Sequence, residues 1–336
     1  MRIAINGAGI AGTAFAYWLG KLGHEVLLVE RAPQLRTGGF VVNLWGIGYD
    51  AVERMGLLPG LLERQHHSDE LRMVDAAGRT RGGYPSHVLV KLAKGRMATL
   101  ARFDIAAAIH GALDDRVDIR FGDTITRIDD RGGAVRIDFE HALSCEVDLV
   151  IGADGRTLFF VLLRDEYLRG RIPAEAGERK AMLADALAGV GWEASAILSA
   201  LGQVDDVYLD SISQIRMDAW TKGRVALIGD AAACPSLIAG EGAGFALAEA
   251  YVLAGELHRH AGDTAATFAQ YEARLKAVVA RKQKQAERLA ASFVPRTALG
   301  VRVRDYATLL MRLPMFPTLL MGRYFHDEMV LSDYGI

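Results

Sequence analysis

The sequence predicts an α/β protein in which a first domain on a parallel sheet carries an inserted α+β domain on a mixed or antiparallel sheet, followed by C-terminal helices. Three observations support this prediction. The chain opens with a strand, a helix and a second strand. Buried strand patterns return at 147–151 and 224–229, far from the opening. Within 69–98 the pattern changes to short alternating runs separated by Gly and Pro, which indicates another layer.

In chain order, the opening strands are expected at Arg2–Asn6 and 26–30, with a helix at 11–22 between them. The later elements alternate in the same way. Further helices are expected at 46–58, 103–113, 180–187, 192–200, 242–258 and 264–291, and further strands at 117–121, 134–139, 147–151, 158–163, 207–217 and 224–229. The first domain is therefore discontinuous. It comprises 1–68, 99–155 and 222–290, the second domain comprises 69–98 and 156–221, and 291–336 forms a helical tail.

Composition excludes several classes of protein. The 336 residues carry a net charge of −2, which gives no general attraction to nucleic acid. No run of about 18 apolar residues predicts a membrane span, and Met1–Asn6 passes into glycines rather than into a signal peptide. The cysteines Cys145 and Cys234 fit neither a disulfide framework nor a zinc site. We expect a cytoplasmic protein without a metal, with monomer and dimer both open.

A glycine-rich turn follows the first strand and opens the first helix. Gly7, Gly9 and Gly12 are spaced so that one permits a tight turn, one lets a pyrophosphate approach the backbone, and one lets helix pack on strand. The helix begins with Ile10 and Ala11, where free N–H groups and the positive helix end favour phosphate. The alternative is a glycine-rich turn that binds nothing. The flanking strands favour a Rossmann-like dinucleotide site.

An acidic residue closes the second strand. Glu30 lies 18 residues beyond Gly12, with Arg31 beside it. At that position a carboxylate accepts hydrogen bonds from ribose hydroxyls and repels the additional phosphate of NADP. The sequence therefore predicts FAD or NAD at the first site.

Two later segments carry further polar residues at strand ends. "VIGADG" places Asp154 after a buried strand, and "RVALIGDAA" places Gly229 and Asp230 after another. Asp230 is a suitable acceptor for polyol hydroxyls, although alone it is equally a helix N-cap, and Asp154-Gly155 alone is an ordinary turn.

Downstream of Asp230 the chain favours close contact with a flat ring. Pro235 fixes a turn, and Gly240 and Gly242 let the backbone approach the ring. A helix begins there with Ala243, and its positive end would favour negative charge on the ring.

Together, in this order, the three segments resemble the FAD-dependent aromatic hydroxylases of the para-hydroxybenzoate hydroxylase fold, and among them the flavin monooxygenases that inactivate tetracyclines or tailor polyketides. The resemblance covers nearly the whole chain. It implies that the glycines of the first turn contact the FAD pyrophosphate, that Glu30 holds the adenosine ribose and that Asp230 bonds the ribityl chain.

The resemblance also implies roles for residues outside the three segments. Arg102, in "LARFDIAAAI", is similar to the arginine that reaches the central part of the cofactor, and the alternative is a surface helix arginine. Asp154 is similar to the aspartate that serves both FAD and the reductant. Arg36 and Asn43, near the glycines at 38 and 39, resemble residues that border the flavin and the incoming nicotinamide.

The chain departs from this family in two places. After Gly155 the family continues with substrate-domain strands, a large part of which is missing here. Either the protein is shortened or a segment has been removed, and we favour removal because lost strands would expose sheet edges. An intact mass of 36.4 kDa would contradict removal. Ala233 stands where many relatives carry histidine, so tuning by an imidazole is absent.

Substrate contacts are less well marked. Phe160 and Leu162 share a face of one expected strand and line either a pocket or a core. Gln214 and Arg216 share a face of another, where an exposed or paired polar role is favoured over contact with a phenolate or carbonyl.

Two other features favour ordinary structural readings. His66-His67 indicates a surface pair rather than a metal site. The tail at 309–325 is expected to pack over the first domain and the pocket mouth, with a membrane surface as the alternative.

The resulting hypothesis is a flavin-dependent monooxygenase that uses FAD, NADPH or NADH, and O2. A flavin C4a-hydroperoxide would pass one oxygen atom to an aromatic or polycyclic small molecule, and no side chain need act as a nucleophile. The alternatives are a flavin oxidase or reductase, and a non-catalytic flavoprotein that binds or sequesters a small ligand. The Trp-x-Trp-x-Ile pattern of flavin halogenases is absent.

Overall fold

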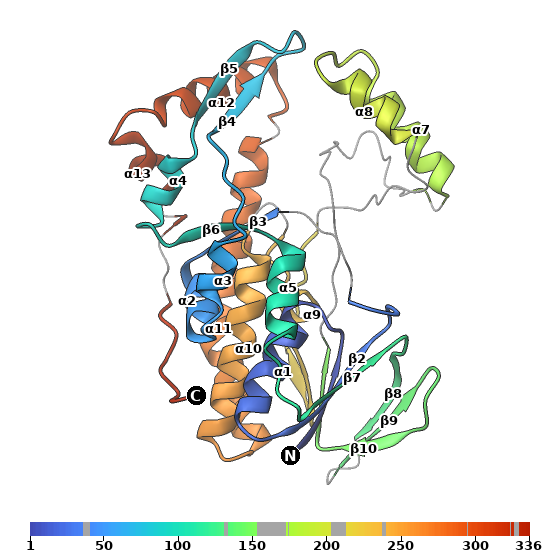
Figure 1. The fold of residues 1–336 in the computed structure, drawn as a ribbon. Helices are drawn as coiled ribbons and strands as arrows, with labels where there is room; N and C mark the ends of the chain where they lie inside the picture. Colours follow the sequence, from blue (N-terminus) through green and yellow to red (C-terminus); the bar gives the residue numbers. More distant parts are fainter. Residues whose placement is uncertain are drawn as a thin grey trace.

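The structure is a computed structural model that describes residues 1–35, 41–130, 134–152, 173, 175–202, 213–236, 240–293, 295–322, 324–325 and 329–336. Its lower part holds a sheet between a layer of helices and a smaller sheet, and its upper part holds a hairpin with several helices (Figure 1). The helix α11 (Thr264–Phe293) runs between the two parts.

A six-stranded sheet forms the centre of the lower part. Its strand order is β12-β13-β11-β1-β2-β7, parallel except for β12, which runs antiparallel to β13 at one edge. The strands are β1 (Arg2–Asn6), β2 (Glu25–Glu30), β7 (Val117–Phe121), β11 (Leu149–Gly152), β12 (Thr221–Lys222) and β13 (Val225–Leu227). Parallel strands covered on both faces are apolar throughout, which explains why these segments lack polar alternation.

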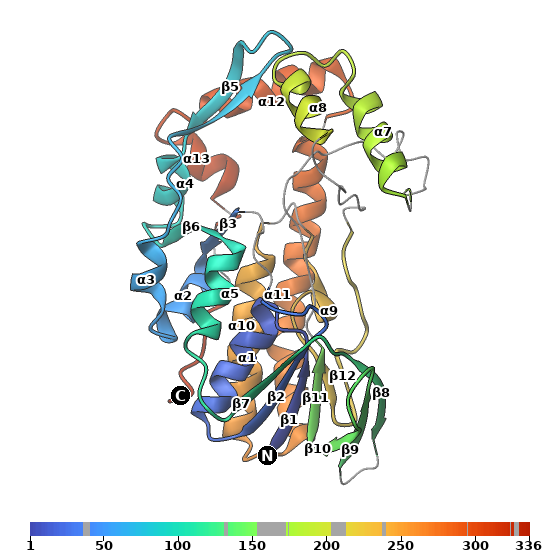
Figure 2. The ribbon, with the colours of Figure 1, turned by 45° about the vertical axis from the view of Figure 1, so that its right-hand side comes forward.

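Alternate residues of the strands enter two different cores. Ile3 and Ile5 of β1 pack with the helices α1 (Ile10–Lys21) and α10 (Gly242–Arg259). Ala4, between them in sequence, packs on the opposite face against a three-stranded antiparallel sheet (Figure 2). That sheet consists of β8 (Ile125–Asp130), β9 (Val135–Phe139) and β10 (Cys145–Val147). The helix α10 is buried along almost its whole length, because α1, α2 and α11 surround it.

The segments beside this core form short paired strands and helices. Strand β3 (Val41–Trp45) pairs with β6 (Met97–Ala101), and β4 (Glu70–Val74) forms a hairpin with β5 (Thr80–Pro85). The remaining helices are α2 (Gly46–Arg54), α3 (Leu58–Leu62), α4 (His87–Leu92), α5 (Arg102–His110), α7 (Ala176–Leu187), α8 (Ala194–Leu201), α9 (Asp230–Ala233), α12 (Ala298–Leu310) and α13 (Phe316–Met321).

The tail packs on the hairpin in the upper part of the molecule. The Thr308 hydroxyl of α12 accepts a hydrogen bond from the Gly83 N–H at 3.0 Å, and Arg312 Nε donates to the Gly83 carbonyl at 3.0 Å. The helix α13 packs against α4. This differs from the expected position over the first domain, although Tyr324 and Phe325 farther along the tail do contact Trp45 near the site described below.

Several expected elements were wrong in detail. The expected helix at 46–58 is two helices, because Gly56 has a φ of 74° between them. Helix α4 at residues 87–92 was not expected within the alternating pattern of 69–98, and the polar strand β8 was missed. Residues 213–217 are not a strand. The strand expected at 158–163 lies outside the described residues.

Candidate functional site

The turn between β1 and α1 leaves no room for side chains. Gly7 has a φ of 112°, in the region that favours glycine. A Cβ added at Gly12 would lie 2.0 Å from the carbonyl oxygen of Gly7, so the helix and the turn approach as closely as backbone allows. The N-cap of α1 is Gly9, which has no side chain to cover the first N–H groups of the helix. This end of α1 is therefore suited to bind an anion such as a phosphate.

Glu30 joins the end of β2 to the same turn. Its side chain is buried, and its two oxygens accept hydrogen bonds from the N–H groups of Ala8 and Ala32, each at 2.9 Å. A carboxylate oxygen has further lone pairs, so the fixed group can also accept from a hydroxyl. Arg31 next to it is exposed.

A second glycine corner contacts the first turn of α1. Gly229 has a φ of 62°, and a Cβ added there would lie 2.8 Å from the Cβ of Ala11. The next residue, Asp230, is exposed and begins α9. A Cβ added at Gly242, the first residue of α10, would lie 3.7 Å from Asp230 Oδ1. The carboxylate therefore lies between the starts of α1 and α10.

A depression lies on the far side of the α10 start. It is lined by residues of β3, α2 and α10, namely Asn43, Trp45, Ile47, Glu241, Gly244 and Phe245. Gly240, at a φ of 66°, faces it, since a Cβ added there would be 3.5 Å from the Trp45 ring. The Trp45 ring is nine-tenths buried, and its Nε1 has no hydrogen-bond partner among the described residues. The Asn43 Oδ1 accepts from the Thr99 hydroxyl at 2.8 Å.

A buried ion pair closes one wall of this depression. Lys282 of α11 donates to Glu241 Oε1 at 2.7 Å, and both side chains are almost fully buried. Lys282 also donates to the Tyr324 carbonyl at 3.2 Å. The Phe325 ring lies 5.3 Å from the Trp45 ring, centroid to centroid. Burial, together with the negative charge of Glu241, raises the pKa of the Tyr324 phenol, which therefore stays neutral.

The cysteine of the second corner is not a nucleophile. Burial, as the largest cause, and then the nearby Asp230 raise the pKa of the Cys234 thiol to about 11. A thiol with that pKa is almost wholly protonated at neutral pH. Among the described residues, no group of three or more His, Cys, Asp or Glu could hold a metal ion, and no helix is long and apolar enough to cross a membrane.

The expected substrate residues lie in a polar network instead of a pocket. Gln214 Nε2 donates to the carbonyls of Pro235 and Gln283, at 3.1 and 2.8 Å. Arg216 donates to Gln214 Oε1 and pairs with Glu287 at 2.6 Å. This is the paired arrangement that the sequence favoured, and it supports the turn at Pro235.

The structure brings most of the expected cofactor residues together. The Gly229 corner lies against Ala11 in the first turn of α1, Asp230 lies near Gly242, and the residues just around Gly242, Glu241 and Gly244, line the depression together with Asn43. Ala243 is half-buried in the first turn of α10, and Arg102 follows the strand that pairs with β3. The expected residues Arg36, Asp154 and Phe160 lie outside the described residues.

Sequence reasoning missed Trp45 and the Lys282–Glu241 pair. Trp45 shares a strand face with Asn43, so period-two alternation could have found it. Nothing in the sequence relates Lys282 to Glu241, because two different helices bring them together.

A parallel sheet with a glycine turn suited to an anion and an exposed carboxylate along its edge defines a dinucleotide-binding protein. Comparison with known proteins identifies the family to which the chain belongs. No family model matches the chain. It is 30% identical over 349 residues to a flavin-dependent monooxygenase from an unknown prokaryotic organism, covering 84% of this chain and 87% of the relative. It is 33% identical over 342 residues to an uncharacterized protein of Mycobacterium tuberculosis, covering 84% and 91%.

Solved structures agree with this assignment. Tetracycline destructase Tet(55) is similar with a TM-score of 0.79 and 26% identity, covering 99% of this chain and 98% of that one. HpxO of Klebsiella pneumoniae, complexed with FAD and uric acid, shares the fold with a TM-score of 0.64 and 19% identity, covering 92% and 97%. The chain therefore belongs to the flavin-dependent monooxygenases, with the fold of the FAD-dependent aromatic hydroxylases.

The alignments also bear on the expected gap in the second domain. The alignment with the mycobacterial relative runs over 342 residues, yet it includes 84% of a 336-residue chain. It therefore contains positions that have no counterpart here. We keep the assignment of the gap to the region after Gly155 as a prediction.

Proposed function

We propose that the chain binds FAD along the track from the β1 turn to the Trp45 depression and uses NADPH or NADH with O2 to hydroxylate an aromatic or polycyclic small molecule. The observation that carries this proposal is the continuity of the track. The track begins with glycine backbone at Gly12 and Gly229, continues with the Asp230 carboxylate and ends at the buried Trp45 donor. A flavin dinucleotide presents its phosphate, polyol and ring in the same order.

Each part of the track has a role that its chemistry supports. The first turn of α1 would hold the pyrophosphate, because its N–H groups and the helix dipole favour anions. Glu30 would accept from the adenosine ribose, and Asp230 from the ribityl hydroxyls. The start of α10 would face the flavin ring and favour negative charge on it. Arg102 would contact the middle of the cofactor, and Arg36 and Asp154 keep the roles that the resemblance implies.

The remaining residues exclude water and orient the substrate. When bound, the reduced flavin supplies the chemistry that activates O2, so that NAD(P)H, a proton, O2 and the substrate give NAD(P)+, water and the hydroxylated product. The Trp45 ring, against which Tyr324 and Phe325 pack, gives the depression an apolar wall. The buried Trp45 N–H has no partner among the described residues, and it would bond a carbonyl or phenolate oxygen.

The proposal is tested with Gly12→Ala and a matched control, Gly60→Ala. The Gly12 change places a methyl group against the Gly7 carbonyl, whereas a Cβ at Gly60 meets nothing within 4 Å. We expect Gly12→Ala to weaken FAD binding by roughly a hundredfold, about 2.8 kcal/mol, and Gly60→Ala to leave it unchanged. Flavin fluorescence quenching measures the affinity.

Turnover is tested with the purified yellow protein. Oxygen consumption and product mass are followed with NADH and with NADPH across a panel of phenols and tetracyclines. We expect substrate-dependent oxygen uptake and a product heavier by one oxygen atom. A protein that binds no FAD at saturation contradicts the whole proposal, and one that binds FAD but oxygenates none of the panel favours a binding or oxidase role.

A further inference from the structure

A fully buried carboxyl group lies directly beneath the second glycine corner. Glu249 of α10 has no exposed surface, and its Oε2 accepts a short hydrogen bond from the Gly229 N–H. Gly229 precedes Asp230, and its φ of 62° sets the direction in which the chain leaves β13. The contact therefore fixes the residue that aims Asp230 at the track.

The surroundings of Glu249 carry no compensating positive charge. Among the described residues, no Lys, Arg or His forms an ion pair with it, and its Oε1 has no hydrogen-bond partner. The nearby Tyr271 is buried and donates to the Leu227 carbonyl instead. Burial is the largest cause that raises the pKa of Glu249, and the charge of Asp230 raises it further.

Burying a carboxyl group without a counter-charge costs stability, so a purely structural role is a poor explanation for Glu249. An apolar side chain would fill the same space in a helix that is otherwise apolar here. What an apolar side chain lacks is an acceptor for the Gly229 N–H. The corner itself is constrained, since a Cβ at Gly229 would overlap Ala11.

We propose that Glu249 is a positioning residue for the cofactor: by accepting from the Gly229 N–H, it holds the corner in the conformation that presents Asp230 to the ribityl chain of FAD. This inference rests on the proposed function. It assigns a role to a group that supports the track from beneath, through the Gly229 N–H, and that does not line the depression. The part of Glu249 that matters is its acceptor oxygen, not its charge.

The test compares two substitutions at this position. Glu249→Gln keeps a neutral side chain of the same shape with an acceptor oxygen, whereas Glu249→Met keeps the volume and removes the acceptor. The matched control is Glu256→Gln on the same helix, because Glu256 is equally buried but lies at the other end, away from the track. The full chain is stripped of flavin and titrated with FAD, and the melting temperature of each flavin-free variant is measured in parallel.

We expect the FAD dissociation constant to rise about tenfold for Glu249→Met, the effect of one lost buried hydrogen bond, and to stay within about threefold for Glu249→Gln. For Glu256→Gln we expect a lower melting temperature with an unchanged dissociation constant. Rescue of FAD affinity by Gln, without a matching change in melting temperature, is the signature that separates positioning from general stability.

Two results would overturn the inference. One is a Glu249→Met protein that binds FAD as tightly as the wild type. The other is a Glu249→Gln protein as weak as Glu249→Met, which would mean that the charge or general stability matters and the acceptor does not. Failure of the proposed function is distinguishable from both, because the wild-type chain itself would then bind no FAD.

Discussion

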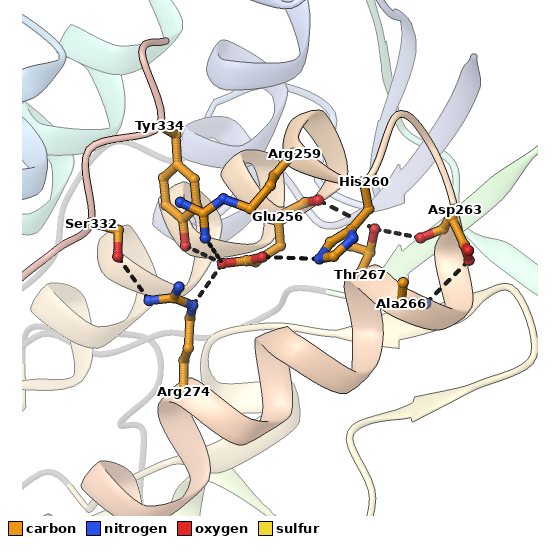
Figure 3. Close-up of polar contacts among 9 residues, drawn as sticks. All are labelled: Glu256, Arg259, His260, Asp263, Ala266, Thr267, Arg274, Ser332 and Tyr334. Atoms are coloured by element: carbon orange, nitrogen blue, oxygen red, sulfur yellow. Dashed lines mark hydrogen bonds and ion pairs between the residues drawn. The ribbon is translucent and has the colours of Figure 1, made fainter.

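The two ends of α10 bury the same residue type in opposite ways. Glu249, in the first half of the helix, and Glu256, about two turns later in the second half, both have no exposed surface. Glu249 accepts from one backbone N–H and has no counter-charge among the described residues. Glu256 Oε1 accepts from Tyr334 at 2.7 Å and pairs with Arg259 at 3.0 Å and Arg274 at 2.6 Å (Figure 3).

The two ends therefore serve different purposes. Around Glu256 the donors converge from α10, from α11 and from the segment at 329–336, so that the carboxylate ties three parts of the chain together. The same segment is held elsewhere, since Tyr251 donates to the Ser332 carbonyl and Arg54 to the Leu331 carbonyl. A carboxyl group that is held by donors from three parts of the chain fixes the fold at one end of the helix. A carboxyl group that accepts from one backbone N–H supports the site at the other end.

The largest effect on stability is expected at Glu256. Glu256→Gln leaves Arg259 and Arg274 facing an amide, and breaking a buried ion pair costs roughly 3 kcal/mol, at the lower end of its range because both arginines are partly exposed. Urea unfolding measures the loss. Equal losses for Glu249→Gln and Glu256→Gln would remove the contrast between the two ends.

A smaller loss is expected next to it, at Gly255. A Cβ added there would lie 2.2 Å from the Tyr334 ring, so Gly255→Ala displaces that ring from its position. Overpacking of this kind costs about 1–3 kcal/mol. We expect unfolding at lower urea concentration with unchanged FAD affinity, and the control Gly60→Ala should not shift the midpoint. A change in FAD affinity would mean that the two ends communicate.

Tyr334→Phe isolates one hydrogen bond to Glu256. Burial and then the Glu256 carboxylate raise the pKa of the Tyr334 phenol, which keeps it a hydrogen-bond donor at every pH of interest. Loss of the Tyr334 hydroxyl should lower the free energy of unfolding by about 1 kcal/mol, as measured by urea unfolding. If Tyr334→Phe is as damaging as Glu256→Gln, the arginines contribute nothing.

The smallest effect on stability is expected from the protonation of His24, which lies beside the end of α10. Burial first, then the N-terminal ammonium group and His258, lower the pKa of His24 below 6.5. In the folded chain its neutral Nδ1 accepts from the N-terminal amine at 3.2 Å. The unfolded state therefore binds the proton more readily, and stability is lost as the pH falls below about 6.5. Urea unfolding at pH 7.5 and 5.5 should show this, and His24→Gln should reduce the difference.

Those parts of the fold that rest on local pattern could be predicted. Strands β1 and β7 have the expected bounds, because apolar runs end at the turns that follow them. The glycine turn was predicted because its spacing reflects a backbone contact between neighbours in sequence. The short helix α4 was missed because "HVLVKL" is rich in β-branched residues and lacks the length that shows helical periodicity.

Contacts between distant segments could not be predicted. Glu249 lies in a helix that is buried on all sides, so no face marks it as different, and its partner Gly229 comes from another element. The depression has the same character, since β3 and α10 supply its two sides and meet only in the fold. The residues of the cofactor track could be predicted from the sequence, whereas the contacts that support them depend on tertiary packing.

The position of Tyr334 against Gly255 has a consequence for how the molecule is made. Strand β1 begins at residue 2, yet the core that it enters also includes Leu331 and Tyr334. During translation that core stays incomplete until these late residues leave the ribosome, and pairings so far apart in sequence form slowly. We expect the nascent chain to depend on chaperones for longer than a protein whose core is completed within a shorter stretch of sequence.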